Sequence, residues 1–317
     1  MKPKVSVIIP IYGVEKYIER CVRSLFSQSL DRIEFVFVDD CSPDRSILIL
    51  RSLLEEYKSH INEMNWTTLV VNHKKNCGLP TARKTGYLHS SGEYIIHCDS
   101  DDWVDENIYK LLYEEAINRN LDIVWCDYYI SDGNRHMLKD MSLQPRLLQG
   151  PIWNRLIRRS LYENKIIFPS ENKAEDGALM TQLSFYAKAR GHIGIALYYY
   201  YQNPNSMCHQ LSEEASIEKL RQEKANTELK IEFLKFNSKV DEYKKDIIRW
   251  KYAVRNNVFH LIRNEECYRK WKNTYPELNI QFFISSGAPI REKLKFFLVL
   301  CRIYPLLPQY RRKYIKR

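Results

Sequence analysis

The stretch EYIIHCDSDD, residues 93–102, decides the fold because it joins a strand pattern directly to a cluster of carboxylates. Residues 93–98 predict a buried strand, and Asp99, Asp101 and Asp102 follow it at once. Carboxylates this close repel one another, and a divalent cation would relieve that cost. Asp99 and Asp101 stand two apart, so in an extended chain they point to the same side. Mg²⁺ or Mn²⁺ suits such oxygen ligands, and the alternative interpretation is a solvated acidic turn that caps the next helix.

The segments around this stretch alternate between strand and helix patterns. Strands are predicted at 4–9, 34–38, 68–72, 93–98 and 122–130, and helices at 14–29, 47–57, 80–88 and 106–119. This alternation implies right-handed crossovers and an α/β fold with a mostly parallel sheet flanked by helices. Ligands bind such sheets at the carboxyl ends of the strands, where we expect Ile11-Tyr12, Asp39-Asp40 and the carboxylate cluster.

The pattern loosens after Gly150. Trp153, Leu156 and Ile157 are spaced as on a helix, and Ile193–Tyr201 predicts a further strand. Beyond residue 211 the chain reads as helical, because strong helix formers recur at amphipathic spacing in 212–236 and 241–264. We therefore predict two domains, an α/β domain over 1–210 and a helical C-terminal region with a basic tail over 211–317.

The net charge of +10 is concentrated at the C-terminus. Residues 291–317 hold nine of the 49 Lys and Arg residues and a single acid, Glu292, which leaves 40 basic and 38 acidic residues in 1–290. A nucleic-acid-binding protein needs a basic face on its body, so no nucleic-acid partner is predicted.

The same tail, residues 291–317, combines its basic residues with apolar ones at helical spacing. The apolar residues are Leu294, Phe297, Leu298 and Cys301. This combination suits an anionic membrane surface, and the alternative is a solvated basic tail. The sequence shows no signal peptide and no apolar run long enough to cross a bilayer, so we expect a cytoplasmic protein, peripheral on the inner face of the membrane if the tail binds there.

Four motifs occur in the order and spacing of a known family. They are VSVIIPIYGVEKYIERCVRSLFSQSL from residue 5, VFVDDCSPDRS from residue 36, NCGLPTARKTGYLHSSGEYIIHCDSDDWVDEN from residue 76, and AEDG at 174–177. Together they resemble the N-terminal half of a family 2 glycosyltransferase with the GT-A fold. The resemblance implies a Rossmann-like GT-A domain in 1–210 that binds a nucleotide-sugar, with a UDP-sugar as the first expectation, and one Mg²⁺ or Mn²⁺ ion.

The resemblance also implies residues for the donor side of a site. Pro10 and Tyr12 correspond to the loop that packs on the uracil base, and Asp40 to the aspartate that accepts a hydrogen bond from the base. Asn76 and Arg83 match an NxGxxxAR stretch, in which Arg83 would pair with Asp40 or with the diphosphate. Read from the residues alone, Asp40 could instead begin an Asx turn, and Arg83 could be a surface arginine.

The metal and the catalytic base are implied in the same way. Asp101 corresponds to the firmest metal ligand of a DxD motif, Asp99 serves the ribose or the metal, and Asp102 supports the loop. Asp176 corresponds to the base that deprotonates the acceptor hydroxyl, and Glu175 orients it or the acceptor. The alternative for this pair is a helix N-terminus that carries acidic residues.

Several further residues stay without a firm role. Trp153-Asn154 resembles a WNKL-like element on the acceptor side, although a core tryptophan is an equal alternative. His97 precedes the DxD motif within the strand and is expected to be packed, and His192 and His209 are left unassigned.

The resemblance thus predicts a metal-dependent, inverting glycosyltransferase. It would move a sugar from a nucleotide-diphosphate donor to a hydroxyl of a carbohydrate or lipid-linked acceptor, in surface polysaccharide or glycolipid synthesis. A nucleotidyltransferase would need a Gly-rich phosphate loop with Lys or Arg after the first strand, where residues 11–15 read IYGVE. A catalytically silent sugar- or membrane-binding module would not need Asp99, Asp101 and Asp176.

Overall fold

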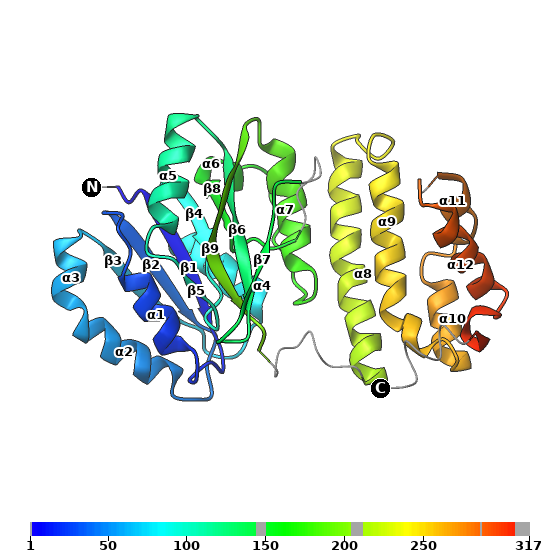
Figure 1. The fold of residues 1–317 in the computed structure, drawn as a ribbon, viewed down its shortest axis with the longest axis horizontal. Helices are drawn as coiled ribbons and strands as arrows, with labels where there is room; N and C mark the ends of the chain where they lie inside the picture. The colour runs from blue at the N-terminus through cyan, green and yellow to red at the C-terminus, as the bar shows by residue number, and fades with distance from the viewer. Residues whose placement is uncertain (1, 144–149, 204–211, 286, 308–317) are drawn as a thin grey trace. The chain divides into compact units, whose positions relative to one another are not determined.

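The chain forms two compact units, Met1–Ser206 and Met207–Arg317. The computed structural model describes residues 2–143, 150–203, 212–285 and 287–307. The first unit is a β-sheet flanked by helices, and the second consists of helices (Figure 1). The predicted mostly parallel α/β fold is therefore confirmed for the first unit.

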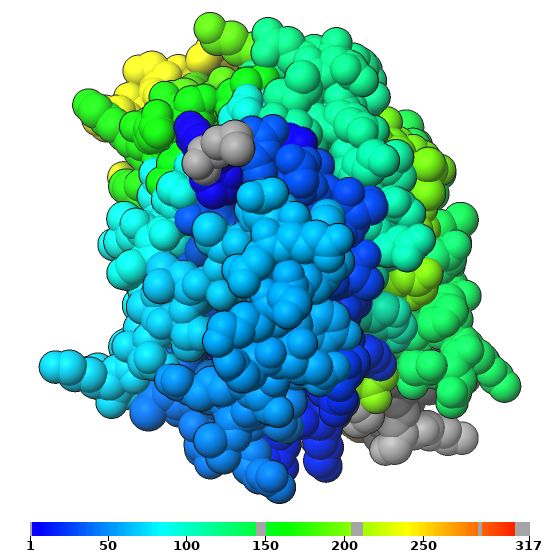
Figure 2. Space-filling view, turned by 90° about the vertical axis from the view of Figure 1, so that its left-hand side faces the viewer, coloured from blue at the N-terminus to red at the C-terminus, as the bar shows by residue number. Residues whose placement is uncertain are grey.

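Four parallel strands form the first half of the sheet. They are β1 (Val5–Ile11), β2 (Ile33–Asp39), β3 (Thr67–Asn72) and β4 (Tyr94–His97), in the spatial order β3-β2-β1-β4. β1 is buried along its whole length because it pairs with β2 on one side and β4 on the other. Its run of Val and Ile suits a strand with both faces covered. β3 is the edge strand, and Figure 2 shows the side of the unit on which it lies together with α2 and α3.

Helices cover both faces of this sheet. They are α1 (Ile18–Phe26), α2 (Ser46–Glu56), α3 (Lys58–Glu63), α4 (Leu79–His89), α5 (Ile108–Asn118), α6 (Arg159–Tyr162) and α7 (Glu175–Tyr186). α4 lies unusually close to β1, because a Cβ atom at Gly86 would stand 2.3 Å from Ile8 Cγ2. This close approach positions Arg83, which lies on the same helix one turn earlier.

The second half of the sheet mixes strand directions. It contains β5 (Trp103–Val104), β6 (Ile123–Ser131), β7 (His136–Lys139), β8 (Arg155–Arg158) and β9 (Arg190–Tyr201). β8 lies antiparallel between β4 and β6, whereas β6 and β9 pair in parallel. The predicted helix around Trp153, Leu156 and Ile157 is wrong, because Leu156 and Ile157 belong to β8 and are buried on opposite faces of the sheet. Apolar residues three and four apart indicate a helix only when the repeat continues, and here it stops within one turn.

The second unit has its own core. Its elements are α8 (Glu213–Phe236), α9 (Lys244–Arg255), a 3₁₀ helix (Asn256–Leu261), α10 (Glu265–Asn273), α11 (Leu278–Ser285), α12 (Ile290–Leu300) and a short 3₁₀ turn (Tyr304–Leu306). Trp271, Phe282 and Phe296 are fully buried at its centre. The predicted helix over 241–264 gives way to the 3₁₀ helix at Asn256-Asn257, since asparagine is a poor helix former. None of the helices among the described residues has the length and apolar character needed to cross a membrane.

Candidate active site

Carboxylates from distant parts of the sequence meet at one edge of the parallel sheet. Asp39 ends β2, and Asp99 to Asp102 follow β4, so both groups lie at the carboxyl ends of parallel strands. Helix α4 contributes Arg83 to this group, and the first turn of α7 contributes Glu175 and Asp176.

Arg83 connects the two groups of acids that the sequence motifs keep apart. Its Nη2 donates to Asp99 Oδ1 at 2.7 Å, and its Nη1 donates to Glu175 Oε1 at 2.7 Å and to Asp176 Oδ1. The Arg83 side chain is 2% exposed and its acid partners are between 12% and 24% exposed, so the cation is buried while the carboxylates reach solvent. The suggested pairing of Arg83 with Asp40 does not occur, and the DxD motif and the Glu175-Asp176 pair form a single site instead.

The three carboxylates share Arg83, and the buried Arg155 lies close enough to Asp176 to lower the pKa of that carboxyl. Burial raises the pKa of Glu175 to about 8, and the neighbouring Asp176 adds to the effect. Burial also raises the pKa of Asp176, although Arg83 opposes the shift. The pair therefore holds a proton more readily than free carboxylates do, which suits groups that exchange protons near neutral pH.

Asp101 and Asp102 differ in their surroundings although they are adjacent. Asp102 is fully buried, and its two oxygens accept hydrogen bonds at 2.7 Å from the Tyr198 hydroxyl and the Tyr201 backbone N–H. Asp101 is partly exposed, and among the described side chains it accepts a hydrogen bond from Asn203 Nδ2 at 3.3 Å. Burial and the nearby Asp99 raise the pKa of Asp101 to about 6. Asp101 is thus the acid of the pair that is open to a ligand, and Asp102 ties the loop to β9.

Tyr198 and Arg20 also hold this loop, and sequence reasoning missed both. The Tyr198 hydroxyl accepts a hydrogen bond from the Asp99 backbone N–H at 3.1 Å while it donates to Asp102. Arg20 Nη2 donates to the Asp101 carbonyl at 2.9 Å, and its guanidinium lies 3.7 Å from the centre of the Trp103 ring. Both contacts join residues more than 80 positions apart, which no motif spacing can reveal.

The donor-side residues gather around Asp40. Asp40 is buried, and its oxygens accept hydrogen bonds from His73 Nδ1 at 2.7 Å and from the backbone N–H groups of Cys77 and Gly78 at 2.8 Å. His73 Nε2 bonds in turn to Thr85 Oγ1 at 2.9 Å. His73 was not predicted, although its position directly after β3 was a usable signal. These bonds fix the loop that leads into α4.

The remaining expected donor-side residues lie near this loop or at the end of β1. Pro10 is buried within β1, whereas Tyr12, just beyond it, is 50% exposed and free to pack on a ligand. Asn76 is exposed, and its Oδ1 accepts a hydrogen bond from the Gly78 N–H at 3.1 Å. Gly78 itself has φ +86°, and a Cβ there would stand 2.7 Å from Asn172 Oδ1, so glycine is required.

The donor atoms of the DxD segment fit a hard divalent cation that is completed by a diphosphate. Among the described residues, two groups bring three possible ligand atoms within 4.8 Å of one another: Asp40–His73–Cys77 and Asp127–Asp140–His192. Asp99 and Asp101 belong to neither group. A metal ion held by Asp99 and Asp101 would therefore need phosphate oxygens or water as further ligands.

The acceptor-side candidates Trp153 and Asn154 are both packed, and so is His97. Trp153 is 5% exposed and stacks on Tyr198 at 4.2 Å, so it is a core side chain. Asn154 is fully buried and donates to the Cys126 carbonyl. His97 is packed as expected, with its Nε2 at 3.2 Å from the Tyr162 hydroxyl.

The two unassigned histidines have different outcomes. His192 Nε2 lies 2.7 Å from Asp127 Oδ1, on the stretch of β9 that pairs with β6. His209 falls outside the described residues.

The chain belongs to glycosyltransferase family 2. The pattern of the family described as Glycosyl transferase family 2 matches residues 6–176, which include the DxD segment and the Glu175-Asp176 pair. The chain is 33% identical to the uncharacterized glycosyltransferase EpsJ of Bacillus subtilis (strain 168) over 227 residues, which cover 65% of this chain and 63% of EpsJ. Membership of this family supports a glycosyltransferase rather than a nucleotidyltransferase.

Solved structures show the same fold at low sequence identity. S. aureus TarS 1–349 in complex with UDP-GlcNAc matches 99% of this chain and 92% of its own, with a TM-score of 0.70 and 20% identity. The mannosyltransferase PcManGT from Pyrobaculum calidifontis, in complex with GDP-Man and Mn²⁺, matches 99% of this chain and 84% of its own, with a TM-score of 0.57 and 14% identity. The predicted GT-A fold is confirmed by these likenesses.

Proposed function

We propose that this glycosyltransferase moves a sugar from a nucleotide-diphosphate donor to an acceptor hydroxyl with inversion, assisted by a divalent metal ion. The observation that carries the proposal is the Arg83 cluster, because Arg83 bonds to Asp99 of the DxD segment and to Asp176 of the acid pair. A donor-binding element and a proton-accepting element thereby face one another across a single guanidinium, as a transfer reaction requires.

Asp99 and Asp101 are the residues that would hold Mg²⁺ or Mn²⁺. Asp101 has one weak hydrogen-bond partner, and Asp99 has one oxygen paired with Arg83 at 2.7 Å, so each has ligand capacity left. When bound, the ion supplies charge neutralisation for the departing diphosphate. Arg83 is held too firmly by carboxylates to serve as the main diphosphate ligand, and we assign it to positioning.

Asp176 is the proposed base, and Glu175 its protonated neighbour. The base must take a proton from the acceptor hydroxyl as that oxygen attacks the anomeric carbon opposite the leaving group. Asp176 Oδ2 accepts only a 3.3 Å hydrogen bond from the Ile152 N–H among the bonds described, so it retains a lone pair for this proton. Glu175, with its pKa raised to about 8 by burial, carries a proton at neutral pH and lowers the repulsion within the pair.

We propose that Asp40 recognises the nucleotide base of the donor through a hydrogen bond, and that Pro10, Tyr12 and Asn76 also bind the donor. Asp40 Oδ2 accepts one bond, from the Gly78 N–H, and can accept a second from a uracil ring N–H. A UDP-sugar is therefore our first candidate donor, and the UDP-GlcNAc complex of TarS supports it. The GDP-Man complex of PcManGT makes a GDP-sugar the necessary comparison.

The proposed acceptor is a carbohydrate or lipid-linked hydroxyl in surface polysaccharide or glycolipid synthesis. The support is family membership, since the described residues near Asp176 leave the acceptor sugar open. We propose that residues 1–210 carry the whole reaction and that residues 211–317 serve another purpose.

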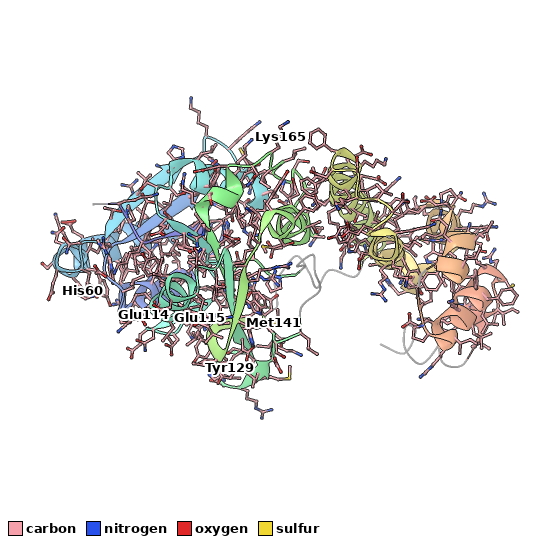
Figure 3. All side chains as sticks on the ribbon, turned by 90° about the horizontal axis from the view of Figure 1, so that it is seen from above. His60, Glu114, Glu115, Tyr129, Met141 and Lys165 are labelled. Carbon is pink, nitrogen blue, oxygen red and sulfur yellow. The ribbon has the colours of Figure 1, made fainter. Side chains whose placement is uncertain are left out.

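Metal-dependent hydrolysis of a donor panel tests the proposal. UDP-glucose, UDP-galactose, UDP-GlcNAc and GDP-mannose are each incubated with Mn²⁺, Mg²⁺ or EDTA, and the nucleoside diphosphate released is measured. We expect release from a UDP-sugar with metal and none with EDTA. Asp101→Ala should abolish release, whereas Glu114→Ala, a change at an exposed acid of α5 that Figure 3 labels, should not. Undiminished release from Asp101→Ala would overturn the site assignment.

A further inference from the structure

Helix α12 carries a row of large apolar side chains on its exposed side. Ile290 is 87% exposed, Leu294 58% and Phe297 50%, and their spacing of four and three residues places them on one side of the helix. The opposite side already faces the core through Phe296 and Val299, which are buried. The exposed row is therefore a second apolar surface of an already packed helix.

Helix α11, which packs on α12, also carries exposed apolar side chains. Ile280 and Ile284 lie four residues apart and are 69% and 75% exposed, whereas Phe282 between them is buried and stacks on Phe296 of α12 at 4.6 Å. Figure 1 shows α11 and α12 side by side, at the side of the second unit away from α8. We name the five exposed residues of the two helices the outer face: Ile280, Ile284, Ile290, Leu294 and Phe297.

Basic residues are neighbours of the apolar row of α12 in the sequence. Arg291 is exposed beside Ile290, and Lys293 reaches across to α11, where its Nζ donates to the Phe283 carbonyl at 2.7 Å. Over residues 291–317 nine Lys and Arg residues stand against one acid, while the preceding 290 residues are close to neutral. An exposed apolar row within a strongly basic segment is the pattern of helices that lie in an anionic membrane interface.

Two other ways to cover the outer face, insertion across a bilayer and contact with a second copy of the chain, fit less well. α12 has 11 residues and is about 16 Å long, which is half of what a bilayer-spanning helix requires. A second copy of the chain, docked through the same face, would bring two basic segments together and repel. An anionic lipid surface instead accepts the apolar side chains and neutralises the basic ones at once.

We propose that the outer face docks this enzyme on an anionic membrane surface, beside membrane-held acceptors. The proposal goes beyond the transfer reaction, because none of the outer-face residues belongs to the Arg83 cluster. It deepens the expectation for the basic tail by assigning the apolar contact to α11 and α12, which lie among the described residues.

Vesicle sedimentation of the full chain tests the proposal. The wild-type protein should sediment with phosphatidylcholine vesicles that contain phosphatidylglycerol, stay in solution with phosphatidylcholine alone, and be released as salt screens the charges. Leu294→Glu/Phe297→Glu should lower the partition coefficient at least about tenfold, since each buried apolar side chain alone contributes that much. The control Leu48→Glu/Phe236→Glu makes the same changes at residues that are 65% and 69% exposed, and it should bind as the wild type does.

Two readouts separate this proposal from the proposed function. Both double variants should hydrolyse the donor at the wild-type rate in solution, so a loss of hydrolysis would point to misfolding. In that case Leu294→Gln/Phe297→Gln replaces Leu294→Glu/Phe297→Glu. Equal vesicle binding by the outer-face variant and its control would overturn the proposal. So would a wild-type dimer that the outer-face variant converts to a monomer while vesicle binding stays unchanged, because the face would then join two copies.

Discussion

Replacing Arg83 by methionine should destabilise the protein in a strongly pH-dependent way. Methionine keeps the apolar stem but leaves Asp99, Glu175 and Asp176 without the cation that they share. Removing one partner of a buried ion pair costs about 3–5 kcal/mol, chiefly because uncompensated charge stays buried. We therefore expect the free energy of unfolding of Arg83→Met at pH 8 to fall by about that amount.

The sign of the pH dependence follows from proton binding. Arg83 lowers the pKa values of Glu175 and Asp176, so without the guanidinium these values rise further above their unfolded values and the folded variant binds more protons than the folded wild type. Its stability relative to the wild type must then recover as the pH falls. Each extra proton is worth about 1.4 kcal/mol per pH unit, so about 2.7 kcal/mol should return between pH 8 and pH 6 for one proton.

Urea unfolding followed by circular dichroism at pH 6, 7 and 8 measures this change. Arg158→Met is the matched control, because Arg158 pairs with the single carboxylate of Asp122 at 3.2 Å and both side chains are partly exposed. Arg158 also donates to Asn120 Oδ1 and to the Leu121 carbonyl, which carry no charge, so the deficit of Arg158→Met should change little between pH 6 and pH 8. A deficit of Arg83→Met that stays constant between pH 8 and pH 6 would refute the shared-cation reasoning.

Three other predictions concern proton and metal binding in the active site. Asp176→Asn should lower sugar transfer roughly 100-fold or more and leave UDP affinity unchanged, because the base acts on the acceptor. Glu175→Gln should cost far less at pH 7, since burial holds the pKa of Glu175 at about 8 and the residue is already protonated there. The affinity for Mn²⁺, measured by calorimetry, should rise about tenfold per pH unit up to pH 6 and then level off, because Asp101 must lose its proton and has a pKa of about 6. Asp101→Asn should remove that slope, and a slope that survives in the variant would assign it to another group.

The parallel half of the fold was predictable because it depends on local patterns. The runs of Val and Ile in β1 and β2 are buried strands, and the acids predicted at strand ends do lie at one edge of the sheet. The failure at Leu156-Ile157 has the same origin, since a four-residue strand buried on both faces gives no period that distinguishes it from a helix turn.

The hydrogen bonds and ion pairs between the site residues could not be predicted from the sequence. The motifs placed Arg83 and Asp176 near a ligand, but they did not show that the two residues bond to each other. His73 and Tyr198 contribute through contacts 33 and 96 residues away in sequence, to Asp40 and Asp102. Such contacts depend on which strands pair and in which register, and this information is present only in the tertiary structure.

The close approach of α4 to β1 carries a consequence for how variation can act on this enzyme. A methyl group at position 86 would need the space of Ile8 Cγ2, so even alanine must push the helix away from the strand. Arg83 lies one turn earlier and would move with the helix, and a displacement of about 1 Å is enough to lower a rate 100-fold. The spacing of the charged cluster thus depends on a residue without a side chain, so low tolerance to mutation should extend to Gly86, a position that carries no functional group.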